Sequence, residues 1–199
     1  MMSSVQEVHI SFTNKTDSGL TISAVNQFNT VGGGSDDVSF SVAGGFGKLV
    51  FGATDGAAGT YEMNPLGLLQ EEDAGTLNNG VTTVAAASAT TASISTSTGG
   101  GETNGSSKVS YHLPAIGGLT AGVSMSTQGT TAGTDDNTQF GMNYALTAGG
   151  AAVTLGYATT TTEVADAVDT DVTSMGIQVV HGNISFAAAD GQYTAADED

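Results

Sequence analysis

Residues 10–55 read ISFTNKTDSGLTISAVNQFNTVGGGSDDVSFSVAGGFGKLVFGATD, and this stretch decides the fold. It contains four short runs in which apolar and polar residues alternate, and the first of them alternates Ile10 and Phe12 with hydroxyl side chains. Successive side chains of a β-strand point to opposite faces, so this period of two, carried by β-branched and aromatic residues, is typical of half-buried strands. The stretch therefore predicts four consecutive strands.

Six further alternating runs lie between residues 109 and 193, which brings the expected number of strands to about ten. The connections between the runs alternate in length. The short ones are 15–19, 44–47, 114–118, 147–150 and 181–182, and the long ones are 29–37, 55–107, 127–137 and 159–172. A Greek-key sandwich does not sort its loops in this way, whereas an up-and-down transmembrane barrel has short turns at one end and long loops at the other. The pattern predicts an all-β fold, an antiparallel up-and-down transmembrane β-barrel that forms a single domain over residues 1–199.

Three motifs in these runs resemble a known family. FTNKTDSGLTISA at 12–24 and VSFSVAGGFGKLVFGATDGAAG at 38–59 are similar to the early strands of alphaproteobacterial-type general diffusion porins, and KVSYHLPAIGGLTAGVSMS at 108–126 is a weaker match. Those porins are Gram-negative outer-membrane barrels of about 16 strands. With about ten strands, this chain is expected to be part of a larger porin barrel or a small closed barrel.

The resemblance also implies a function and a location. It implies a water-filled pore in the cell outer membrane, passive diffusion of small hydrophilic solutes and ions, a homotrimer, and no enzymatic activity. An alternative from a different class is a secreted, acidic β-sandwich or β-roll that acts as a surface or adhesin-type protein. That alternative shares the Ser, Thr, Gly and Asp-rich composition of this chain.

The connection 55–107 is far longer than an ordinary loop and is the expected functional element. By resemblance it is the long third-loop insertion of the barrel, and its first part, 54–75, folds inward and narrows the pore. The acidic side chains that would then line the constriction are Glu62, Glu71, Glu72 and Asp73. The alternative is an acidic loop on the solvated surface.

Charge adds a prediction about the permeant ions. The chain has 20 acidic residues but only three lysines and no arginine, which gives a formal net charge of −17. Because nucleic-acid binding needs clustered basic residues, nucleic acid is excluded as a partner. Lys15, Lys48 and Lys108 share the parity of the polar strand faces, so all three are expected to face the lumen. Carboxylates that outnumber cations in a narrow passage favour cations, and the pore is predicted to prefer them.

Other chemistry is sparse in the sequence. Without cysteine the chain has neither disulfides nor thiolate metal sites. Two acidic pairs, Asp36 with Asp37 and Asp135 with Asp136, could form a weak Ca²⁺ site, although neither matches an EF-hand loop. The alternative is that they are solvated loop tips, and no other cofactor is expected.

Overall fold

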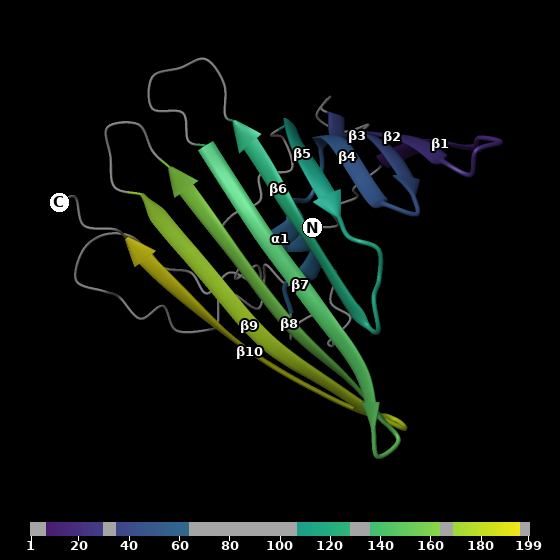
Figure 1. Cartoon of the computed structure of the whole chain (residues 1–199). Helices are drawn as coiled ribbons and strands as arrows, with labels where there is room; N and C mark the ends of the chain where they lie inside the picture. Colours follow the sequence, from purple (N-terminus) through teal and green to yellow (C-terminus); the bar gives the residue numbers. More distant parts are fainter. Residues whose placement is uncertain (1–6, 30–34, 64–106, 128–135, 164–168, 196–199) are drawn as a thin grey trace, which may run out of the picture.

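Ten β-strands form one antiparallel sheet in which each strand is hydrogen-bonded to the next along the chain (Figure 1). The computed structural model describes residues 7–29, 35–63, 107–127, 136–163 and 169–195. The strands are β1 Glu7–Lys15, β2 Thr21–Asn29, β3 Ser35–Gly44, β4 Gly47–Ala53, β5 Ser107–His112, β6 Leu119–Thr127, β7 Asp136–Ala148, β8 Ala151–Glu163, β9 Thr170–His181 and β10 Ile184–Ala195, and the helix α1 is Ala57–Tyr61. The predicted all-β, antiparallel, up-and-down architecture is confirmed.

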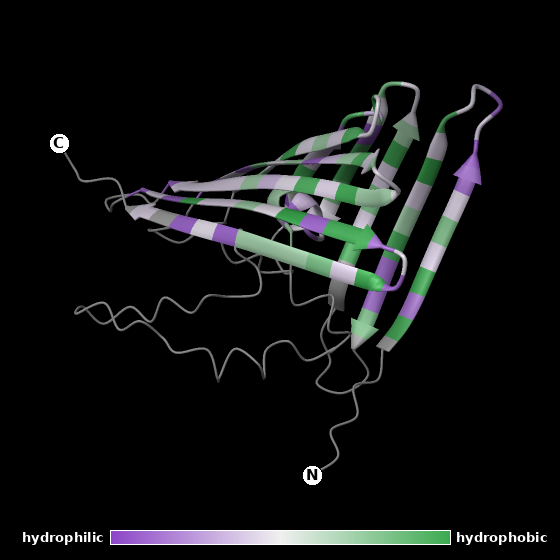
Figure 2. Ribbon diagram, turned by 90° about the horizontal axis from the view of Figure 1, so that it is seen from below, coloured by the Kyte–Doolittle hydropathy of each residue, from purple (hydrophilic) through white to green (hydrophobic). Residues whose placement is uncertain are grey.

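The two faces of the sheet have inverted polarity relative to a water-soluble protein. On one face, here called the outer face, large apolar side chains are exposed: Ile10 and Phe12 are each 58% exposed and Met125 is 63% exposed. On the opposite, inner face, polar side chains are covered, with Ser110 at 1% and Gln139 at 2% exposure. Figure 2 shows the underlying alternation of hydrophobic and hydrophilic residues along the strands. Such an outer face is more stable against lipid than against water, because exposing one large apolar side chain to water costs about 1.5–3 kcal/mol.

Strands β7, β8 and β9 are long enough to cross a membrane. They have 13, 13 and 12 residues, which at about 3.3 Å per residue gives roughly 40 Å of strand. A tilted strand needs about 9–11 residues to cross the hydrocarbon layer. Among the described residues, no helix is both long and apolar enough to span a bilayer.

Three predicted long connections are shorter than expected, because the strands extend into them. β2 and β3 pair Phe28 with Ser35, so only residues 30–34 connect these strands. That connection is no longer than the turn 16–20, and the predicted strict alternation of loop lengths is therefore wrong at this point. β8 likewise extends to Glu163, where Thr161 Oγ1 donates a hydrogen bond to Asp171 Oδ1 at 2.6 Å. The connection after β6, between Thr127 and Asp136, is shortened in the same way.

The sheet curls into a trough and does not close on itself (Figure 2). In the described part of the chain, β1 pairs only with β2 and β10 pairs only with β9. The ten strands therefore do not form the small closed barrel that was one of the two alternatives.

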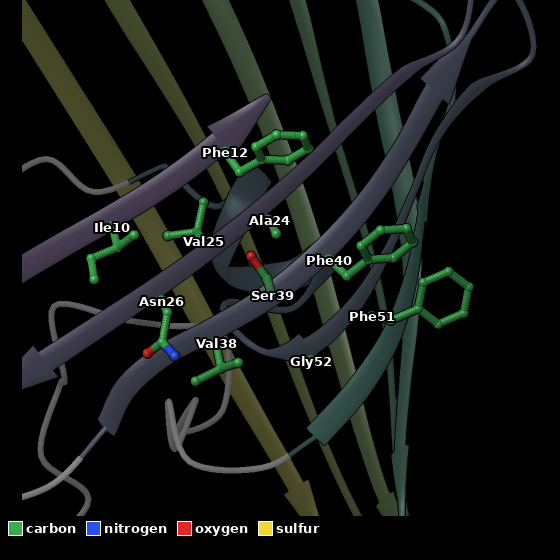
Figure 3. A pocket seen from close by; sticks show the side chains of 10 residues that line it. All are labelled: Ile10, Phe12, Ala24, Val25, Asn26, Val38, Ser39, Phe40, Phe51 and Gly52. Atoms are coloured by element: carbon green, nitrogen blue, oxygen red, sulfur yellow. The ribbon is translucent and has the colours of Figure 1, made fainter. Parts of the chain in front are cut away.

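The outer face carries a shallow apolar hollow over β1 to β4 (Figure 3). Phe12, Ala24, Phe40 and Phe51 follow one another in register across these four strands. Since Ala24 is small and its neighbours are large, the phenylalanine rings leave a depression above it. The hollow lies on the face opposite to α1 and takes no part in the site described below.

Candidate functional site

Residues 54–63, here called the inward segment, leave the end of β4 and lie on the inner face of the sheet. Within this segment α1 packs against β6, β7 and β8 and touches β5 (Figure 1). Ala57 and Ala58 are fully buried against the wall, and Tyr61 is 8% exposed. The chain that follows a membrane strand thus turns into the trough formed by the sheet.

The start of α1 is held by side chains of the wall. Its N-cap residue, Gly56, has no side chain that could bond the first free N–H groups of the helix. Instead Ala57 N donates to Ser124 Oγ at 2.8 Å, and Ala58 N donates to Gln139 Oε1 at 3.0 Å. β6 and β7 therefore supply the cap that the segment itself lacks.

Gln139 is in turn fixed by its neighbours on the wall. Its Nε2 donates to Asn137 Oδ1 at 3.0 Å, and Asn137 Nδ2 donates to Thr162 Oγ1 of β8 at 3.0 Å. A chain of hydrogen bonds in which each amide has a partner holds its members in one orientation. These bonds therefore orient the acceptor that holds Ala58.

The other end of α1 is held by Tyr61. Its hydroxyl donates to Ala121 O at 3.3 Å and lies 3.0 Å from His112 Nδ1, and the two rings are 5.7 Å apart between centroids. The Asn143 amide, oriented with its nitrogen toward the helix, donates to Tyr61 O at 2.7 Å. Burial raises the pKa of the Tyr61 phenol, which keeps it protonated as a hydrogen-bond donor.

The three lysines have different surroundings. Lys15 and Lys48 are exposed and lie near the turns 16–20 and 45–46. Lys108 is only 5% exposed, and its Nζ donates to Thr54 O at 2.6 Å. Lys108 shares the parity of the covered Ser110, which places it on the inner face, where it holds the first residue of the inward segment.

Of the four acidic residues predicted at the constriction, Glu62 belongs to the inward segment. It is half-buried, and its backbone N donates to Ala58 O at 2.8 Å, which ends α1. Glu71, Glu72 and Asp73 lie outside the described residues. Their place at the constriction stays a prediction, as does the extent of the insertion 55–107.

Three of the four proposed calcium ligands lie in strands and not at loop tips. Asp36 and Asp37 belong to β3, Asp136 begins β7, and Asp135 lies outside the described residues. The strands simply extend further than the apolar alternation does. Within the part of the chain that the structure describes, no cluster of three or more His, Asp or Glu residues could hold a metal ion.

Sequence patterns did not reveal the residues that hold the inward segment. The parity of Ser124, Gln139 and His112 predicts that they face the lumen, but alternation carries no information about which segment will cover them. No sequence signal identifies them, because the strong burial of Gln139 is seen only in the packed structure. A long polar side chain that is almost wholly covered requires a hydrogen-bonding partner from elsewhere in the chain.

An apolar outer face, a polar inner face and a segment held inside the curved sheet are together typical of the wall of a membrane β-barrel pore. The sequence matches the Gram-negative porin family over residues 2–199, and the chain belongs to that family. It is an outer-membrane protein, and its family forms diffusion pores. The predicted family and location are confirmed.

Three solved structures are similar to this one. OmpT, an outer membrane protein of Vibrio cholerae, aligns with a TM-score of 0.47 at 10% sequence identity. The alignment covers 95% of this chain and 69% of the OmpT chain. An anion-selective porin from Comamonas acidovorans aligns with a TM-score of 0.43 at 13% sequence identity, over 96% of this chain and 69% of the porin chain. Another porin aligns with a TM-score of 0.42 at 16% sequence identity, over 95% of this chain and 76% of the porin chain. No curated protein matches the sequence.

Proposed function

We propose that the chain forms a water-filled passage through which small hydrophilic solutes and ions diffuse passively, and that the inward segment is part of its constriction. The observation that carries this proposal is the attachment of residues 54–63 to the polar inner face at Lys108, Ser124, Gln139 and His112. A segment attached at this many points stays inside the trough and reduces its cross-section. Residues 64–75 continue from it, and we propose that they complete the constriction.

We further propose that the passage prefers cations. The chain has 20 carboxylates against three lysines, and one of those lysines directs its ammonium group at the Thr54 carbonyl. Carboxylates near a narrow, partly desolvated passage concentrate cations and repel anions. Glu62 lies on the inward segment, where its charge acts on the passage.

Reversal potentials across a planar bilayer test the preference. With KCl more concentrated on one side, a cation-preferring pore makes the dilute side positive, because potassium ions cross faster than chloride ions. A dilute side that becomes negative would show anion preference and would refute the proposal. Lowering the pH to protonate the carboxylates should bring the potential closer to zero, with the same protein at neutral pH as the control.

Other parts of the function follow from the same reasoning. Passive diffusion needs neither a catalytic group nor a cofactor, so we infer that the chain is not an enzyme. Calcium binding by Asp36, Asp37, Asp135 and Asp136 stays a prediction.

A homotrimer in the outer-membrane bilayer is proposed from the family resemblance, and cross-linking in detergent would test it. The secreted adhesin alternative is not favoured, because a soluble protein would not expose the apolar outer face described above.

A further inference from the structure

Met63, two residues after α1, packs against a pair of glycines on the wall. Gly156 of β8 and Gly176 of β9 lie directly opposite each other in register. Both share the parity of covered inner-face residues, namely Ala158 on β8 and Ser174 on β9. The end of the inward segment therefore rests on a place where two neighbouring strands carry no side chain.

The two glycines are not required by the backbone. Neither has a φ in the left-handed region, in contrast to the turn residue Gly182 with a φ of 60°. Glycine within a strand marks either a distorted backbone or the close approach of another chain segment, and here only the second reason applies. The group that approaches both glycines most closely is Met63, although a methyl group would also lie 3.0 Å from the Asn143 amide at position 156 and 3.1 Å from Ala188 O at position 176.

The two positions constrain overlapping parts of Met63. A methyl group at position 156 would overlap Met63 Cγ and lie 3.1 Å from Met63 Sδ. A methyl group at position 176 would lie 2.5 Å from Met63 Cβ and 3.1 Å from Met63 Cγ. Gly156 therefore makes room mainly for the outer part of the methionine side chain, and Gly176 makes room mainly for its first carbon.

We propose that Met63 is a positioning residue of the constriction: by packing onto Gly156 and Gly176 it sets how far the end of the inward segment stands from the wall. The inference rests on the proposed function of that segment. Ser124 and Gln139 hold the start of α1 at β6 and β7, and Met63 holds the segment two strands further along the wall. An unbranched thioether side chain fills such a narrow space well. Because the chain continues from residue 63, this point governs the width of the passage.

A set of alanine variants tests the proposal through single-channel conductance in planar bilayers. Gly156→Ala should push Met63 away from the wall and lower the conductance by about twofold, because conductance falls with pore diameter. Met63→Ala removes Cγ and Sδ but keeps Cβ. It should therefore relieve most of the effect of Gly156→Ala but only a smaller part of the effect of Gly176→Ala, when each pair is compared in a double-mutant cycle.

A second measurement reports on the segment when no current is recorded. The chain has no cysteine, so Ser174→Cys introduces a single thiol on the covered inner face of β9, two residues from Gly176. Its reaction with a water-soluble thiol reagent should be several-fold faster in the Gly156→Ala background and return to the starting rate when Met63→Ala is added. Gly45→Ala, in a turn with open space around it, is the matched control and should change neither readout.

The outcomes separate this inference from the proposed function. A wild-type protein that inserts but does not conduct refutes the pore, while the thiol measurement still tests the role of Met63. The role of Met63 is overturned if Met63→Ala fails to rescue Gly156→Ala, or if it rescues Gly176→Ala as fully as it rescues Gly156→Ala. If Gly156→Ala does not fold, the yield of folded protein replaces conductance: recovery in the double variant supports the proposal, and continued failure overturns it.

Discussion

Replacing Gln139 by leucine should release the start of the inward segment. The substitution keeps a side chain of similar size but removes the oxygen that accepts the Ala58 N–H bond at 3.0 Å. Ala58 is fully buried, so its N–H would be left without a partner at a cost of about 1–3 kcal/mol. Ser124 would still hold Ala57, and the global fold should persist.

That cost acts on the equilibrium between the docked and released segment. A change of about 1–3 kcal/mol increases the released population by roughly 5-fold to 150-fold. Single-channel recordings should therefore show many more brief fluctuations in current than the wild-type protein does.

Gln178→Leu is the matched control for this experiment. Gln178 is a half-buried glutamine on β9 with the parity of Gly176, so it faces the lumen away from the start of α1. The control separates loss of a lumen amide in general from loss of the bond to Ala58. Equal fluctuation rates in the Gln139→Leu and Gln178→Leu proteins would refute the reasoning.

Three further predictions follow from the same structure. Phe12→Arg, on the outer face, should make membrane insertion less favourable by about 2–4 kcal/mol if residue 12 lies near mid-membrane. Thr13→Arg, on the inner face, should insert normally. The fraction of each variant that folds into lipid vesicles measures the difference. Tyr61→Phe removes the hydrogen bonds of the hydroxyl to His112 and Ala121. It should increase current fluctuations less than Gln139→Leu does, because each hydrogen bond makes a net contribution of only about 1 kcal/mol. Fluctuations equal to or larger than those of Gln139→Leu would contradict this ranking. Glu62→Gln should shift the reversal potential toward zero, and an unchanged potential would remove Glu62 from the selectivity argument.

The strand faces could be predicted from the sequence, but the strand ends could not. Alternation placed Ile10 and Phe12 on one face and Ser110 on the other because side chains of a strand must alternate. The threonines at 159–162 break that apolar alternation, so the sequence predicts a loop there. In the structure they pair with β9, since threonine favours a strand once a partner strand is present.

The wall contacts of the inward segment were beyond sequence reasoning for a different reason. Ser124 and Ala57 are separated by 67 residues, and Gln139 and Ala58 by 81. No local pattern links positions so far apart. The glycines at 156 and 176 could have been noted as unusual in strands, yet only the packed structure shows that Met63 is the group they accommodate.

The inverted faces of the sheet also govern how the protein loses its structure. In the described residues, few apolar side chains are buried, so the cohesion of the sheet depends mainly on its ladder of backbone hydrogen bonds. Inside a bilayer no water competes for those groups, and breaking a rung leaves two of them without partners. Amide protons in the centre of β8, paired on both sides over almost their full length, should therefore exchange with deuterium more slowly than those of β1 and β10, and exchange should accelerate once detergent replaces the lipid.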